Sequence, residues 1–74
     1  MHKQVVMDRT GDTVHEFDPA FALSVKEAME RFDELVKNQG MTAATRNSDG
    51  TSQITRNFDP TATETLFIPR LAGG

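Results

Sequence analysis

The last residues of the sequence have types and spacing that suit chemistry at a carboxyl group. Arg70-Leu71-Ala72-Gly73-Gly74 follows the apolar run Thr65-Leu66-Phe67-Ile68. Two successive glycines carry no side chains and adopt backbone angles closed to other residues, so this segment could thread a narrow channel. It could there present the Gly74 carboxyl carbon to ATP or to a nucleophile. The alternative is that residues 69–74 are a frayed terminus without a function.

The rest of the chain offers no comparable site, so we expect it not to be an enzyme. There is no cysteine, which excludes a thiol nucleophile and a thiolate metal site. The two histidines, His2 and His15, have no carboxylates at metal-ligand spacing, and neither has a reason to meet a particular serine. We predict no catalytic residue, no metal site and no cofactor.

Charge and hydropathy limit the partners. The chain has 8 basic and 11 acidic residues, and its basic residues are scattered. Nucleic-acid binding needs a basic face that matches the phosphates. A local patch would form if Arg46, Arg56 and Arg70 converged, but we favour solvated strand edges and expect no nucleic-acid partner. The sequence also lacks a signal peptide and a run of roughly 20 apolar residues, which predicts a cytoplasmic protein without a membrane partner.

The N-terminal segments predict a β-hairpin. Residues 4–9 have the period of a strand, with Val5 and Met7 on one face and Asp8 on the other. Residues 10–12 have turn chemistry, and residues 13–17 form the second strand.

An amphipathic helix is predicted at about residues 24–38. Ser24 and Glu27 match a capping box, and Gly40 suits the left-handed position that follows a helix. Two pairs at i,i+4 spacing, Glu27–Arg31 and Asp33–Lys37, support the helix. Its apolar stripe comprises Val25, Ala28, Met29, Phe32, Leu35 and Val36. We expect Met7, Met29 and Phe32 to lie in the core.

The second half of the chain predicts three further strands. Residues 42–46 form one strand, residues 47–50 a turn, and residues 51–58 a strand near the edge of the sheet. Residues 59–64 form a capped turn. The apolar residues 65–68 suit a central strand that is buried on both faces, or nearly so, and lies beside the first strand.

This order of elements resembles the β-grasp fold of the ubiquitin-like superfamily. Residues 63–74 are similar to the end of ubiquitin, where a threonine–leucine strand leads into an arginine–leucine–x–glycine–glycine tail. Phe67-Ile68-Pro69, followed by Gly73-Gly74, also resembles the ends of bacterial sulfur carriers. The resemblance implies an α+β domain over residues 1–71, with a mixed sheet of four to five strands on one helix, and a flexible tail at residues 72–74.

The resemblance implies a substrate role. An E1-like adenylating enzyme would activate the carboxylate of Gly74, with Gly73 and Gly74 as the activation site and Arg70, Leu71 and Ala72 read by that enzyme. The product would be an isopeptide bond on a target protein or a thiocarboxylate that donates sulfur. An E2-like enzyme and a JAB-type isopeptidase are the further partners that it implies.

Two departures from the ubiquitin pattern leave the recognition surface open. Pro69 stands where ubiquitin has a hydrophobic contact residue, and residues 41–58 are more polar than the corresponding strands. The hydrophobic recognition patch of ubiquitin therefore cannot be assigned from the sequence. The alternative function is a small non-catalytic binding or assembly module with an inert tail.

Overall fold

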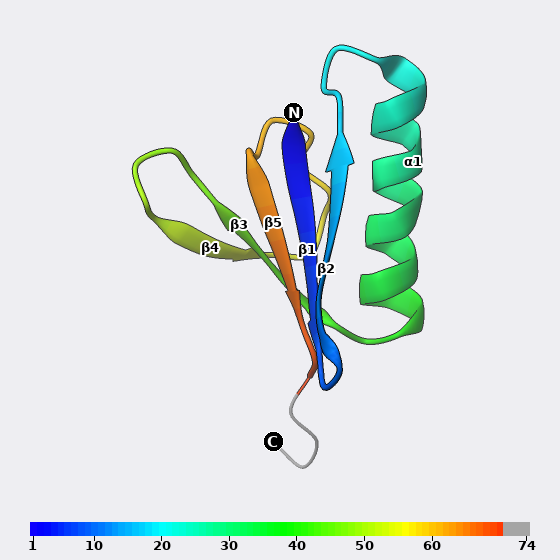
Figure 1. The fold of residues 1–74 in the computed structure, drawn as a ribbon, viewed down its shortest axis with the longest axis vertical. Coiled ribbons are helices and arrows are strands. Elements are labelled where there is room, and N and C mark those ends of the chain that lie inside the picture. Colours follow the sequence, from blue (N-terminus) through cyan, green and yellow to red (C-terminus); the bar gives the residue numbers. More distant parts are fainter. Residues whose placement is uncertain (71–74) are drawn as a thin grey trace.

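Five strands and one helix are formed by residues 1–70, the part of the chain that this computed structural model describes (Figure 1). The elements are β1 (His2–Asp8), β2 (Gly11–Phe17), α1 (Ala22–Asp33), η1 (Glu34–Asn38), β3 (Thr42–Arg46), β4 (Ser52–Thr55) and β5 (Glu64–Ile68). The strand order is β2-β1-β5-β3-β4, with β1 and β5 parallel and the other neighbours antiparallel. This α+β, β-grasp-like architecture confirms the predicted fold class.

The N-terminal hairpin forms as predicted and is longer than expected. β1 pairs with β2 from His2↔Phe17 to Asp8↔Gly11. Gly11 has a φ of 127°, which a residue with a side chain rarely adopts. The tight turn therefore depends on glycine at this position.

The helix begins earlier than the capping box predicts. α1 starts at Ala22 with Phe21 as its N-cap, and Val25 N–H donates to the Phe21 carbonyl at 3.0 Å. Ser24 lies inside the first turn, where its Oγ accepts a hydrogen bond from the Asp18 backbone N–H at 2.9 Å. The predicted capping box is wrong because Ser24 instead ties the preceding loop to the helix.

The helix ends in a wider turn. Residues 34–38 form a π-helical segment, η1, and Met41 N–H donates to the Leu35 carbonyl at 2.9 Å. Gly40 follows the C-cap Gln39 with a φ of 69°, which confirms its predicted left-handed role. The predicted ion pair between Lys37 and Asp33 is present at 3.4 Å.

The predicted Glu27–Arg31 pair is replaced by a buried polar contact. Arg31 Nη1 donates to Gln4 Oε1 at 2.8 Å, while Gln4 Nε2 donates to the Ala28 carbonyl at 2.9 Å. The Gln4 side chain is fully buried, and these two bonds satisfy both ends of its amide. Gln4 thus joins β1 to the middle of α1.

The three later strands agree with the sequence in order and differ in extent. β3 spans Thr42–Arg46 as predicted, and β4 ends at Thr55, so residues 56–58 lie outside the edge strand. β5 lies in the centre of the sheet, between β1 and β3. It is buried on one face only: Thr65 and Phe67 are buried, whereas Ile68 is 42% exposed. The predicted burial on both faces is therefore wrong.

An aromatic cluster fills the space between sheet and helix. The rings of Phe32 and Phe67 lie edge to face with centroids 5.6 Å apart. Phe58 bridges Phe32 at 6.0 Å and Phe17 at 5.8 Å. Because these residues come from α1, β2, β5 and the segment before β5, the cluster joins both halves of the chain.

Of the three predicted core residues, only Phe32 is confirmed. Met29 lies on the outer side of α1 and is 43% exposed. Met7 lies with Val5 on the sheet face opposite the helix, because its neighbour Val6 is the residue that packs on the core. The strand period was predicted correctly, but it does not say which of its two faces is covered.

Candidate functional site

The predicted activation site follows the central strand. Gly73 and Gly74, together with Leu71 and Ala72, lie outside the described residues. The chain reaches Pro69 and Arg70 at the end of the domain where α1–η1 ends and where β1 turns into β2 (Figure 1). Both residues are exposed. Since β5 is held by β1 on one side and β3 on the other, the position at which the segment departs is fixed by the sheet.

Arg70, a predicted recognition residue, lies in a groove of about 590 Å³. We call it the basic groove. It is formed by η1, the loop to β3, the adjoining ends of β3 and β4, and Arg70. Its apolar lining on the helix side includes Val36, Met41 and Ala43, and its cationic lining is Lys37, Arg56 and Arg70.

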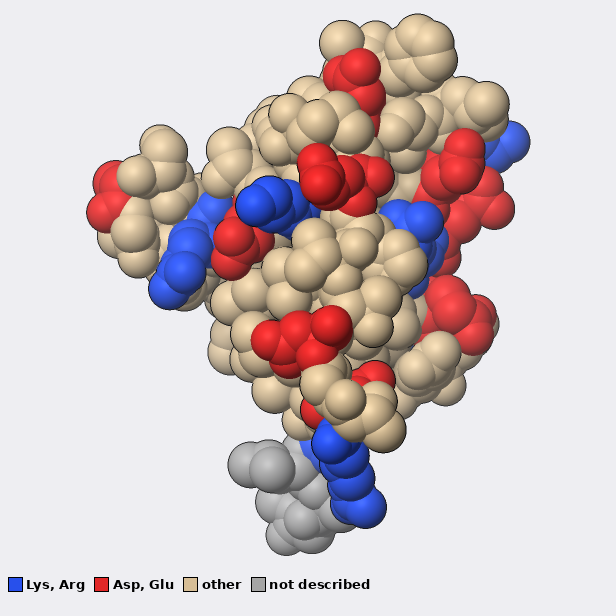
Figure 2. Space-filling model, in the orientation of Figure 1, with Lys and Arg blue, Asp and Glu red and all other residues tan. Residues whose placement is uncertain are grey.

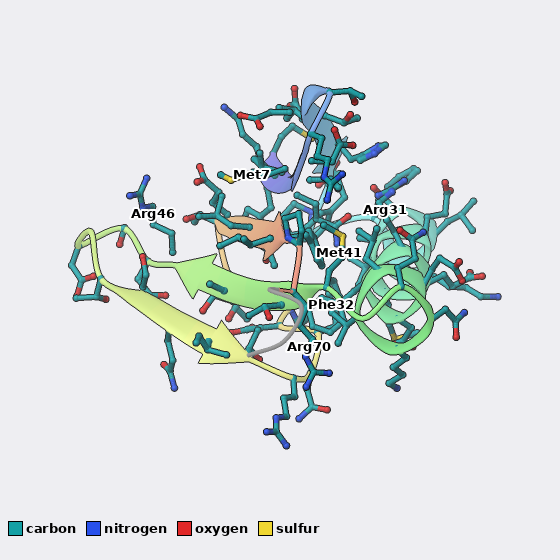
Figure 3. The ribbon with its side chains drawn as sticks, turned by 90° about the horizontal axis from the view of Figure 1, so that it is seen from below. Met7, Arg31, Phe32, Met41, Arg46 and Arg70 are labelled. Atoms are coloured by element: carbon teal, nitrogen blue, oxygen red, sulfur yellow. The ribbon has the colours of Figure 1, made fainter. Side chains whose placement is uncertain are left out.

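The sequence raised the convergence of three arginines, and the structure brings two of them together. Arg56 and Arg70 both line the basic groove. Arg46 lies on the other side of the sheet, with its Nη1 at 3.9 Å from Glu64 Oε1, and Figure 3 shows it far from Arg70. This separation leaves a local cationic groove in place of a continuous basic face.

A second surface is an apolar row across the sheet face opposite the helix. The register aligns one residue from each strand, namely Val14, Val5, Leu66, Ala44 and Ile54. The two ends of this outer row are the most open, with Val14 54% and Ile54 72% exposed. No described element covers this face. Exposed apolar patches of this kind mark sites of protein association.

Charges of both signs are interspersed on the face shown in Figure 2, with acidic side chains along the margin where α1 lies. On this face, the described residues form no continuous basic surface of the kind that a nucleic-acid backbone requires.

The two histidines take separate structural positions. The His2 ring stacks edge-on against Phe17 with centroids 5.4 Å apart, and its Nδ1 is 3.1 Å from the Pro60 carbonyl oxygen. The pKa of His15 is lowered, first by desolvation and then by the charge of Arg31. Within residues 1–70, His, Asp and Glu side chains form no cluster that could hold a metal ion.

Three turns repeat one Asp-x-Thr arrangement. In each, the threonine backbone N–H and hydroxyl both donate to one aspartate oxygen, at 2.8–2.9 Å and 2.6 Å. These hydrogen bonds, led by the one from the threonine side chain, lower the pKa of Asp8, Asp49 and Asp59. All three carboxylates stabilise turns, and none of them lines the basic groove.

Comparisons with family models, curated proteins and solved structures find no match for this chain. Among the described residues, no helix is long and apolar enough to cross a membrane.

The sequence did not predict the outer row, and it anticipated the basic groove only in part. The outer row could have been found by aligning the alternating residues of all five strands, but that needs the strand order and register. For the basic groove, the sequence raised a convergence that included Arg56 and Arg70, but it did not indicate Lys37 or the place of the groove, since these residues come from three separate segments.

Proposed function

We propose that this chain is a ubiquitin-like protein whose Gly74 carboxylate is activated by an adenylating enzyme and transferred. The observation that carries the proposal is the position of β5. This strand is central and parallel to β1, and the segment with the two glycines follows it directly. A rigid domain would thus be joined to a narrow segment that an enzyme could enclose.

The chemistry takes place in the partner. The Gly74 carboxylate, free at the end of the translated chain or after cleavage of a longer product, attacks the α-phosphorus of ATP and releases pyrophosphate. A thiolate, an amine or sulfide then attacks the acyl adenylate and releases AMP. This chain supplies the electrophile and no catalytic group. Gly73 and Gly74 avoid steric conflict around the tetrahedral intermediate, while Arg70, Leu71 and Ala72 provide contacts for the enzyme.

Transfer from the activated Gly74 could give either of two products, and we propose both as alternatives. An amine of a target protein gives an isopeptide bond, and sulfide gives a thiocarboxylate. Both require the same activation step, so loss of the terminal glycines should abolish both.

Mass spectrometry of cells that express the chain tests the proposal. Trypsin cleaves after Arg70, so a modified lysine would carry a Leu71-Ala72-Gly73-Gly74 remnant. The intact mass of the chain would reveal a thiocarboxylate. The matched control lacks Gly73 and Gly74 and retains residues 1–72. Absence of both products from abundant full-length chain would contradict the proposal.

A second candidate is a non-catalytic binding module, which the outer row favours. In this case the chain would associate with an apolar surface of a partner protein through Val14, Leu66 and Ile54. Replacing Ile54 with aspartate would abolish that association, whereas removal of Gly73 and Gly74 would leave it intact. The two candidates are therefore separated by a matched pair of variants.

A further inference from the structure

The basic groove is open because one helix covers only part of the sheet. α1 and η1 pack over β1, β2, β5 and the beginning of β3, through Phe32 and Leu35. β4 extends beyond this cover. Figure 3 shows Arg70 between the end of β4 and the helix, with Met41 and Phe32 deeper between the two layers.

Its charge is opposite to that of the whole chain. The formal net charge is −3, yet the described residues that line the groove include three cationic side chains and no carboxylate. Lys37 has an exposed ion pair with Asp33, while Arg56 and Arg70 form no ion pair with any described residue. An anionic group would therefore find two available guanidinium groups here, in a surrounding that repels anions elsewhere.

The adjacent strand provides a second feature for binding. Among the strands of residues 1–70, β4 is an edge strand that pairs with β3 alone, so one side of its backbone has no strand partner within this range. The opposite edge of the sheet, β2, lies beside α1 (Figure 1). Free backbone groups at a sheet edge can accept an additional extended segment.

The two faces of β4 specify the side chains that such a segment would need. Thr55 pairs with buried Ala43 and faces the helix side, where Lys37 and Arg70 line the groove. Ile54 pairs with Ala44 and faces the outer side, where it is 72% exposed. A strand laid against β4 would alternate between these two environments, one cationic and the other apolar.

We propose that the basic groove and β4 bind an extended acidic segment of a partner protein. The segment adds to the sheet as a sixth strand beside β4. Its acidic side chains contact Arg56, Arg70 and Lys37, and its alternate aliphatic side chains pack beside Ile54. This interaction goes beyond the proposed activation of Gly74, because it uses only residues of the body and Arg70.

The probe is a blocked octapeptide of alternating valine and glutamate, added to isotope-labelled full-length chain. We expect amide shifts in β4 (Ser52–Thr55) and around Met41, Arg56 and Arg70 in NMR spectra. A control peptide in which lysine replaces each glutamate tests whether binding needs negative charge on the peptide. A peptide of the same sequence, methylated at alternate backbone nitrogens, tests strand addition. Both control peptides should bind much more weakly.

Charge reversal in the groove gives the sharper test. Arg56→Glu should weaken binding of the valine–glutamate peptide by about tenfold or more, as expected for loss of one charge-assisted contact. Arg46→Glu is the matched control, because it changes the net charge equally on the other side of the sheet. It should leave the affinity within about twofold, since surface charges act weakly at a distance.

Several results would overturn the proposal. These are no binding at roughly 1 mM peptide, equal effects of Arg56→Glu and Arg46→Glu, or undiminished binding of the methylated peptide. Tighter binding of single-stranded DNA than of the peptide at the same sites would assign the groove to a nucleic acid. Shifts that appear on dilution without peptide would assign it to a second copy of the chain. Because removal of Gly73 and Gly74 should not alter peptide binding, failure of this proposal is distinguishable from failure of the activation proposal.

Discussion

The two faces of the sheet differ in what they bury, and their hydrophobicity does not predict which one is the core. The face toward α1 carries Phe17 and Phe67, but also the buried polar residues Gln4, Thr45 and Thr65. The opposite face carries the outer row, which is wholly aliphatic and partly exposed. The outer row is flanked on the same face by the charged residues Lys3, Arg46 and Glu64. The comparison shows that aliphatic residues stay partly exposed where no helix covers the sheet, while single polar residues are buried where one does. Four predictions test this comparison, from the largest effect to the smallest.

Phe67→Ala should be the most damaging change. Phe67 is fully buried and its ring packs edge to face against Phe32, so its removal leaves a cavity and should lower the free energy of unfolding by about 3–5 kcal/mol. Leu66→Ala, one residue away on the other face, should cost about 1 kcal/mol. Chemical denaturation of both variants measures the difference. Equal losses would mean that both faces are packed alike.

Gln4→Met should destabilise the domain although it makes the buried face more apolar. The change removes the bonds to Arg31 and to the Ala28 carbonyl and should cost about 1–3 kcal/mol. The control is Val5→Thr on the outer face, which should cost less. Urea denaturation compares the two. A more stable Gln4→Met variant would show that the buried amide is dispensable.

Ile54→Ser should change stability by less than about 0.5 kcal/mol, because its side chain is largely exposed at the sheet edge. Thermal denaturation measures this effect. The same variant should lower the affinity for the valine–glutamate peptide. An effect on binding without an effect on stability would separate a binding role of Ile54 from a folding role. A large loss of stability would place Ile54 in the core and contradict the comparison.

The loss of stability at low pH should come from the Asp-x-Thr turns rather than from either face of the sheet. The hydrogen bonds from Thr61, first that of its hydroxyl and then that of its backbone N–H, lower the pKa of Asp59 below its ordinary value. The associated stability is complete above the unfolded pKa and is lost as the pH falls through the lower folded pKa. Asp59→Asn should therefore flatten the decline in melting temperature below about pH 4.

The control for this acid effect is Asp12→Asn. Asp12 lies in β2, next to the first turn, and has no side-chain hydrogen bond within residues 1–70. Its replacement should leave the shape of the pH profile unchanged. If both variants gave the profile of the unaltered chain, the Asp-x-Thr turns would not contribute to acid sensitivity.

Local patterns were sufficient where the deciding interactions are local. The helix, the turns at Gly11 and Gly50, and β3 follow from periodicity and from glycine in left-handed positions, both of which depend on near neighbours in the chain. The predicted capping box was wrong because the Ser24 side chain is used by a contact outside the helix. Ser24 has a cap-forming side chain, but a contact with Asp18 from the preceding loop competes for it.

In the candidate site, too, the residues that are adjacent in the sequence were predicted more fully than those that only folding brings together. The activation residues were predicted from adjacent residue types, since Gly73 and Gly74 need only each other and a preceding strand. For the basic groove, the sequence could name Arg56 and Arg70 as residues that could converge, but not their position beside Lys37, because the three residues meet only after η1, β4 and β5 are assembled.

The sequence by itself determined the order of the strands along the chain, the amphipathic helix and the expectation of a β-grasp fold. Only the tertiary structure decided which face of each strand is covered, that Gln4 is buried while Ile54 is exposed, and that two arginines line one groove. The physical reason is that a strand presents two faces at equal spacing. Which of them becomes the core depends on where a helix from elsewhere in the chain comes to lie.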